Sequence, residues 1–270
     1  MQVGSPASAR LHDCKRLVDA VREAGALALQ SFGGQFKSWT KHGDSPVSEV
    51  DIALDQLLRK RLVDQTTDDG WLSEESENDP ARLTKRRVWI VDPIDGTRGF
   101  IAGRPDWSIS AALVEDGRPT VAAVFAPATD ELFIAVAGVG ATRNDAPIAV
   151  NADAGLEGAR IAGPKRRLDA IAARHPRIVP VPKIFSLALR LVRVAQGELE
   201  AAMAGPNGHD WDLAAADLLV HEAGGMLTSL DGKPLTYNQP NPVHGVLVAA
   251  GRERHPTLLE LVRAHQRDFS

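Results

Sequence analysis

Two acidic residues directly follow a run of apolar residues, and this order limits how the chain can fold. Val88–Val91 are all apolar, and Asp92 and Asp95 come next in the segment DPIDGT, which its Pro and Gly mark as a turn. A wholly apolar run predicts a buried strand, so Asp92 is expected to emerge from the interior. An unpaired carboxylate would be costly there or would stay protonated. We therefore expect a cation between Asp92 and Asp95.

The composition sets the class of protein. The 270 residues are 44% hydrophobic, which is enough for one large domain or two modest ones. A formal charge of −4 predicts that neither nucleic-acid polymers nor acidic membranes are partners. The N-terminal residues lack the apolar core of a signal peptide, and no run approaches the ~20 apolar residues of a membrane span. With Cys14 as the single cysteine, we expect a cytoplasmic protein.

The first half is expected to combine helices with an antiparallel sheet. Apolar residues recur at the helical period in residues 11–32, and a second helix is expected at 48–65, where Ser48 and Asp51 resemble a capping box. Short β-rich runs separated by turn signals follow, and their close spacing favours antiparallel pairing. These strands are expected at residues 87–92, 108–119, 120–132 and 132–138.

The pattern changes near residue 150. We place a boundary there, between an α+β domain at residues 1–150 that holds the main acidic motifs and an α/β domain at 151–270. After the boundary, short apolar strands alternate with helical stretches, which is typical of a mixed α/β unit. Strands are expected at 160–163, 177–182 and 245–251, and helices at 186–204, 212–225 and 255–269.

Acidic residues recur at the ends of these elements. They are Asp51, the pair Glu74–Glu75, the pair Asp92 and Asp95, and Asp212. Each one alone has an ordinary explanation as a helix cap, an exposed loop or a turn residue. Together they form a set of hard oxygen ligands of the kind that Mg²⁺ prefers, and the eight histidines show no zinc-binding spacing.

The residues after Asp95 predict a place for phosphate. Backbone NH groups of Gly96 and Thr97 at a helix start would bind an anion, and Gly96 lets the main chain approach closely. Asp212 would add a third carboxylate from the other half of the chain, so the site would lie in a cleft between the halves. Two metal ions there could hold the attacking water and the leaving oxygen of a phosphate ester.

These residues resemble a known family. WIVDPIDGT, with SEE upstream and WDLAAADLLVHEAGG downstream, is similar in order and across nearly the whole chain to the inositol monophosphatase superfamily of Mg²⁺-dependent phosphatases. The DxDGT motif of haloacid dehalogenase phosphatases differs, because its aspartates are two apart, whereas Asp92 and Asp95 are three apart. The resemblance implies a layered α/β/α/β/α sandwich, a homodimer and a small phosphorylated metabolite as substrate.

The resemblance also implies roles for individual residues. Glu74, Asp92 and the carbonyl of Ile94 would bind one Mg²⁺; Asp92, Asp95 and Asp212 would bind a second, and a third, weaker ion would lie near Glu74. Thr97 and Asp51 resemble the pair that orients and deprotonates the attacking water, with Glu74 assisting. Gly96, Thr97, Arg98 and Asp212 are the expected substrate contacts, and Ser186 is expected to face the substrate.

The identity of the ester is less constrained. Inositol monophosphatases carry a substrate-recognising glutamate several residues before the WD pair, where this chain has Met203, Ala204 and Gly205. DSPVSEVDIA at 44–53 and LSEES at 72–76 look closer to 3'(2'),5'-bisphosphate nucleotidases, in which Arg98 would serve a second phosphate. Solvent exposure without a partner is the alternative for Arg98, and an inositol-1-monophosphatase or a broad-specificity phosphatase is the alternative for the chain.

A function of another class remains open. A regulatory protein could keep this fold and bind a metal ion or a nucleotide without turnover, because a fold alone never proves activity. The complete set of acidic residues with Thr97 argues against it.

Overall fold

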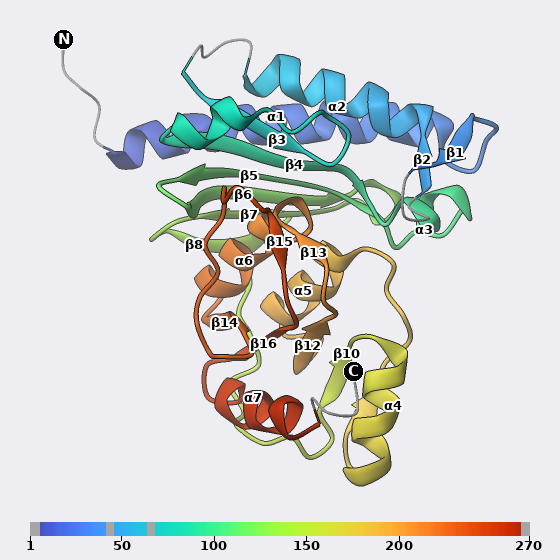
Figure 1. The fold of residues 1–270 in the computed structure, drawn as a ribbon, viewed down its shortest axis with the longest axis vertical. Coiled ribbons are helices and arrows are strands. Elements are labelled where there is room, and N and C mark those ends of the chain that lie inside the picture. Colours follow the sequence, from blue (N-terminus) through green and yellow to red (C-terminus); the bar gives the residue numbers. More distant parts are fainter. Residues whose placement is uncertain (1–5, 42–45, 64–67, 266–270) are drawn as a thin grey trace.

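Five layers of secondary structure make up the molecule. The computed structural model describes residues 6–41, 46–63 and 68–265, with side chains from residue 8 onward. Helices cover one face of a large sheet, two further helices separate it from a smaller sheet, and a last pair lies outside that sheet (Figure 1). In this order the helices are α1 (Pro6–Ser31) and α2 (Glu49–Leu62), α5 (Leu187–Ala195) and α6 (Asp210–Glu222), and α4 (Lys165–Arg174) and α7 (His255–Ala264).

The large sheet has seven strands in sequence order. They are β3 (Gly70–Ser73), β4 (Arg87–Asp95), β5 (Ser108–Glu115), β6 (Arg118–Ala126), β7 (Glu131–Val136), β8 (Gly140–Arg143) and β9 (Ala146–Pro147). From β4 to β9 all neighbours pair antiparallel, which confirms the expectation for this half. The sequence pattern did not predict the short strand β3. It pairs in parallel with β4, and the segment that connects the two strands contains the 3₁₀ helix Pro80–Thr84.

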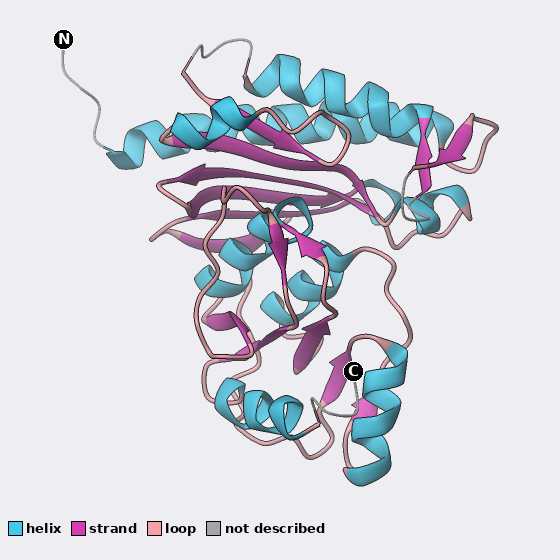
Figure 2. Ribbon diagram, viewed as in Figure 1, coloured by secondary structure: helices cyan, strands magenta, loops and turns pink. Residues whose placement is uncertain are grey.

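The small sheet mixes parallel and antiparallel pairs. Its strand order is β11 (Val179–Pro180), β10 (Arg160–Ala162), β12 (Ala201–Ala204), β16 (Leu247–Gly251) and β14 (Gly225–Ser229). Two-stranded pairs join β1 (Ser38–Thr40) to β2 (Pro46–Ser48), and β13 (Gly208–His209) to β15 (Val243–His244). Figure 2 shows the two main sheets as separate magenta layers with helices between them.

The expected helix over residues 186–204 is wrong in its second half. Helix α5 ends at Ala195, and Ala201–Ala204 form the buried strand β12 between β10 and β16. Gly197 ends the helix because its φ of +73° is left-handed, a conformation that favours glycine after a helix. The alanine-rich segment beyond it has helical propensity, but burial between two strands overrides that weak preference.

The other expected elements are shorter or longer than the patterns predict. Helix α1 begins at Pro6 instead of residue 11, and α2 ends at Leu62; residues 64 and 65 of its expected range lie outside the described residues. Strand β11 covers only Val179–Pro180 of 177–182. Helix α7 ends at Ala264, and residues 266–269 are likewise not described.

Strand β4 is buried on both faces, and this places the acidic residues. Trp89 and Val91 pack in the cluster beneath α1 and α2, whereas Val88 and Ile90 pack in the cluster toward α5 and α6. Alternate residues of a strand point to opposite faces, so two covered faces explain why the run is wholly apolar. The carboxyl end of β4 therefore delivers Asp92 into the interior between the layers.

The capping box predicted for α2 is confirmed. Ser48 is the N-cap, its side chain accepts from the Asp51 NH, and the Asp51 carboxylate accepts from the Ser48 NH at 2.8 Å. Among the helices in the described ranges, none combines the length and apolar character needed to cross a membrane.

Candidate active site

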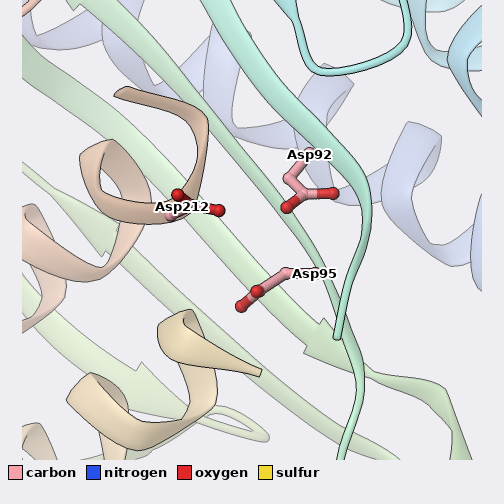
Figure 3. A group of neighbouring side chains, drawn as sticks. All are labelled: Asp92, Asp95 and Asp212. Carbon is pink, nitrogen blue, oxygen red and sulfur yellow. The ribbon is translucent and has the colours of Figure 1, made fainter. Parts of the chain in front are cut away.

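Three carboxylates from the two halves of the chain meet at one point. Asp92, Asp95 and Asp212 each offer an oxygen atom, and these atoms lie within 4.8 Å of one another. Figure 3 shows Asp92 and Asp95 on β4 and Asp212 on the first turn of α6, with their carboxylates facing a common space. Asp92 is 2% exposed and Asp95 is 5% exposed. The three carboxylates therefore do gather, with Asp92 and Asp95 buried and Asp212 half-buried.

A β-bulge brings Asp92 and Asp95 to the same side. Asp92 is opposite Ser110 and Asp95 is opposite Ser108, so three steps along β4 face two along β5. Residues three apart on a regular strand point to opposite faces, and an extra residue in a bulge reverses that. Pro93 and Ile94 thus take up the space of one residue on β5, and the carboxylates of Asp92 and Asp95 share one face of the strand.

The first turn of α5 fixes Asp95. Its carboxylate accepts hydrogen bonds from the backbone NH of Leu187 at 3.1 Å, from the NH of Ala188 at 2.6 Å and from the Ser186 hydroxyl. A helix N-terminus favours negative charge because its NH groups are otherwise unpaired. The Ser186 hydroxyl is used in holding Asp95, and Ser186 is fully buried and is not among the residues that line the cavity, so the expectation that it faces the substrate is wrong.

Asp212 is the third residue of α6 instead of its N-cap or first residue. His209 is the N-cap, and its backbone NH donates to Asp212 Oδ2 at 2.7 Å. The Trp211 carbonyl accepts from the Ser110 hydroxyl at 3.1 Å, and the Trp211 ring stacks on His209 with centroids 4.4 Å apart. These contacts hold the start of α6 against β5 and orient Asp212 toward β4.

Asp51 and Thr97 form a buried hydrogen-bonded pair. Thr97 Oγ1 lies 3.1 Å from Asp51 Oδ1 and 2.9 Å from the Ile94 carbonyl oxygen. The other oxygen of Asp51 accepts from the NH and the hydroxyl of Ser48. The capping box of α2 therefore aims the other oxygen of Asp51 at Thr97, 46 residues later in the sequence.

Gly96 allows the turn between β4 and α3 (Thr97–Ile101). Its φ is +93°, and a Cβ atom there would lie 2.9 Å from Ser186 N and 3.2 Å from the Asp106 carbonyl oxygen. A larger residue would therefore be strained and would push the α5 segment away. The expected turn and helix start after Asp95 are confirmed.

Glu74 lines the same cavity but is not part of the group formed by Asp92, Asp95 and Asp212. It follows β3, and burial, the largest cause, raises its pKa to about 7, although the charge of Lys41 lowers it. The Lys41 ammonium contacts the Glu75 carboxylate and donates to the Glu74 carbonyl at 3.3 Å. Glu74 and Glu75 therefore divide their roles: Glu75 pairs with Lys41, and the Glu74 carboxylate remains at the cavity.

The electrostatics of the cluster call for a cation. Burial is the main cause that raises the pKa of Asp92, followed by the negative charges of Glu74 and Asp95. Burial likewise raises the pKa of Asp212, with the charge of Asp95 next. A dication among these oxygens would reverse the effect, because it replaces repulsion by attraction. Carboxylate oxygens are the donors that Mg²⁺ and Ca²⁺ prefer, so the residues fit such an ion.

A cavity of about 200 Å³ contains the cluster and most of the predicted site. Asp51 and Ile94 lie behind its wall, and Asp44 and Ser45 of the DSPV segment lie outside the described residues. Sequence reasoning missed Lys183 and Phe185, which precede α5 and carry no motif. It quoted Pro46 only as part of DSPVSEVDIA and gave it no place at the cavity. The lining residues are Pro46, Glu74, Asp92, Asp95, Gly96, Thr97, Arg98, Lys183, Phe185 and Asp212.

Comparisons with known proteins agree with this geometry. Residues 12–267 match the inositol monophosphatase family. Histidinol-phosphatase of Mycobacterium tuberculosis is 36% identical, with 82% of this chain and 89% of that protein covered. The 3'-phosphoadenosine 5'-phosphate phosphatase of the same species is 34% identical, with 88% of each covered.

Solved structures give the same fold. An IMPase from Thermotoga maritima superposes with a TM-score of 0.82 at 27% identity, covering 94% of this chain and 97% of that one. The layered sandwich expected from the sequence is thereby confirmed. Matched along nearly its whole length by sequence and by structure, the chain belongs to the inositol monophosphatase family and is a metal-dependent phosphatase.

Proposed function

We propose that the protein hydrolyses a small phosphate monoester with two or three Mg²⁺ ions. The observation that carries the proposal is the convergence of Asp92, Asp95 and Asp212 on one cavity from separate halves of the chain. These three residues, with Glu74 and the Ile94 carbonyl, would hold the ions. Bound Mg²⁺ supplies Lewis-acid chemistry, since it lowers the pKa of water and offsets the charge of a phosphate group.

Asp51 and Thr97 would move the proton of the attacking water. The Thr97 hydroxyl has one hydrogen and two acceptor lone pairs, so it can donate to Asp51 while it accepts from water. The Ile94 carbonyl oxygen, 2.9 Å from Thr97 Oγ1, is the other acceptor within reach of the Thr97 hydrogen and competes with Asp51 for it. A cation held by the Ile94 carbonyl would weaken its attraction for this hydrogen. The Thr97 hydroxyl would then donate to Asp51 Oδ1, and the pair would be able to pass a proton from water to Asp51.

The remaining pocket residues would orient the ester. Gly96 and Thr97 line the cavity, and their backbone would contact the phosphate group. Asp212 and the exposed Arg98 line the same cavity and would contact the rest of the substrate. Glu74 faces the same cavity and would assist the proton transfer. The expected product is an alcohol and inorganic phosphate, with no covalent enzyme intermediate.

We propose a 3'(2'),5'-bisphosphate nucleotide as the preferred substrate, with 3'-phosphoadenosine 5'-phosphate converted to AMP. Met203 and Ala204 are buried in β12 and present no carboxylate where inositol recognition would need one. The 34% identical relative is named as a phosphatase of this compound. The alternatives are an inositol-1-monophosphatase or a broad-specificity phosphatase of the same family, and, in another class, a regulator without turnover.

We also propose that the protein acts in the cytoplasm as a homodimer. The support is its family resemblance and the half-buried thiol of Cys14, which packs against the cluster beneath α1. Burial raises the pKa of this thiol, which lowers its reactivity.

Replacing Asp92 by Asn tests the metal site. We expect Asp92→Asn to raise the melting temperature in EDTA by several degrees, because it removes one of three clustered charges, and 1 kcal/mol is worth about 2–4 °C in a chain of this size. The variant should lose the rise in melting temperature that Mg²⁺ gives the wild type. The exposed Asp116→Asn is the control, and an unchanged Mg²⁺ response in Asp92→Asn would contradict the ligand assignment.

Replacing Thr97 tests the proton relay. Thr97→Val removes the hydroxyl while keeping the shape, so kcat should fall by about 100-fold or more, the usual contribution of a positioned proton-transfer group. Thr97→Ser keeps the hydroxyl and should retain most of the rate. Steady-state kinetics with saturating Mg²⁺ measures both, and equal rates for Val and Ser would show that the hydroxyl plays no part.

A substrate panel tests the proposed specificity. It compares 3'-phosphoadenosine 5'-phosphate, inositol 1-phosphate, fructose 1,6-bisphosphate and histidinol phosphate by released phosphate. We expect kcat/KM for the nucleotide to exceed the others by about tenfold, a difference of ~1.4 kcal/mol. A comparable preference for inositol 1-phosphate would overturn the nucleotidase proposal. Failure of the folded, Mg²⁺-loaded protein to hydrolyse any of the four would favour the regulator.

A further inference from the structure

The cavity of the active site has walls of opposite charge. Its floor holds the carboxylates of Asp92, Asp95 and Asp212, whereas the exposed cations Arg98 and Lys183 line the same cavity nearer to solvent. A phosphate held at the floor would therefore place the rest of its molecule beside positive side chains. Arg98 already has a proposed role in binding the substrate. Lys183 has none, because it belongs to no sequence motif.

The charge of Lys183 is available to a ligand. Its ammonium lies 4.4 Å from the centroid of the Phe185 ring, and in the described part of the chain it forms no ion pair with a carboxylate. The exposed Lys165, by contrast, pairs with Asp169 at 2.6 Å. A cation–π contact at an exposed site is worth only ~0.5–1 kcal/mol and leaves the charge uncancelled. Phe185 thus positions Lys183 without neutralising it.

A second cation at the same ring is already paired. The Arg104 guanidinium lies 5.1 Å from the centroid of the Phe185 ring, and its Nε donates to Asp106 at 3.0 Å. The Asp106 carboxylate offsets the charge of Arg104, so Lys183 is the side chain at this ring whose charge stays uncompensated.

The segment that carries Lys183 is held on three sides. The Phe185 NH donates to the Asp106 carboxylate at 2.9 Å, and the Ser186 NH donates to the Asp106 carbonyl at 3.1 Å. Arg190 donates to the Ile184 carbonyl at 3.0 Å. Gly99 lets the segment approach α3, since a Cβ there would lie 3.1 Å from Phe185 Cβ. The backbone next to Lys183 is therefore held in one position, which lowers the entropy that is lost when the Lys183 ammonium binds a ligand.

We infer that Lys183, positioned by Phe185, binds a second anionic group of the substrate and so determines which phosphate esters the enzyme prefers. The inference rests on the proposed function of the site as a phosphatase. A substrate that carries a further phosphate gains a charge-assisted contact with Lys183. The phosphate ester of an uncharged polyol gains none, and an ester that carries an ammonium group is repelled by Lys183. The favoured class is a phosphate monoester that carries another dianion, of which a nucleoside bisphosphate is an example.

A matched pair of nucleotides isolates this contact. 3'-Phosphoadenosine 5'-phosphate and adenosine 3'-phosphate share the scissile ester and the nucleoside, and they differ only in the 5'-phosphate. We expect Lys183→Met to lower kcat/KM for the bisphosphate about tenfold, chiefly through KM, and for the monophosphate by less than about threefold. Lys183→Arg should restore the preference. Lys165→Met removes the same charge outside the cavity and should leave the ratio of the two kcat/KM values at the wild-type level.

The ratio of the two kcat/KM values decides the outcome. A ratio that is the same in Lys183→Met and in the wild type would overturn the inference, whether both substrates lose or neither does. An equal fall of the ratio in Lys165→Met would also overturn it, because the effect would then be one of overall charge.

Binding of the product separates this inference from the proposed function. AMP keeps the 5'-phosphate but lacks the scissile group, so calorimetry with Mg²⁺ and inorganic phosphate present measures the outer contact without turnover. We expect Lys183→Met to weaken AMP about tenfold, and adenosine to bind both proteins alike. If neither nucleotide is hydrolysed but AMP binding depends on Lys183, only the proposed substrate fails. Equal AMP affinity in both proteins would overturn the inference itself.

Discussion

Repulsion among buried carboxylates is the constraint on which the site depends. Asp92, Asp95 and Asp212 place their oxygens within 4.8 Å of one another, and burial with neighbouring negative charge raises the pKa of Asp92 and Asp212. Oriented hydrogen-bond donors stabilise this arrangement. Backbone NH groups of α5 donate to Asp95, and the His209 NH donates to Asp212. These contacts fix the carboxylates without cancelling their charge, which leaves a cage that favours dications.

The layered architecture makes this cage possible. Strand β4 is covered on both faces, so its carboxyl end opens between layers, and a bulge there turns two aspartates to one side. Helices α5 and α6 begin at the same place, and each contributes its first turn. The site therefore exists only when β4 is packed against the first turns of α5 and α6, which links the site to the packing of the large sheet on the central helices.

Local patterns predicted part of this structure, and tertiary contacts decided the rest. The apolar run before Asp92, the capping box of α2 and the glycine turn at Gly96 are local signals, and the structure contains all three. Asp212 was predicted at the site from its place at the start of an expected helix, and the family motifs then gave it the same role. The segment 201–204 looked helical because alanine favours helices, and burial between strands reversed that preference. Lys183 could not be found, because its distance from β4 depends on packing between segments ~90 residues apart, which no periodicity records.

Diffraction at the manganese absorption edge tests the central claim most directly. Mn²⁺ prefers the same oxygen ligands as Mg²⁺ and scatters anomalously, so crystals soaked in it report where the cage holds an ion. We expect anomalous peaks between the carboxylates of Asp92, Asp95 and Asp212, with Glu74 beside one of them. Peaks elsewhere on the molecule, with these carboxylates bound only to protein groups, would contradict it.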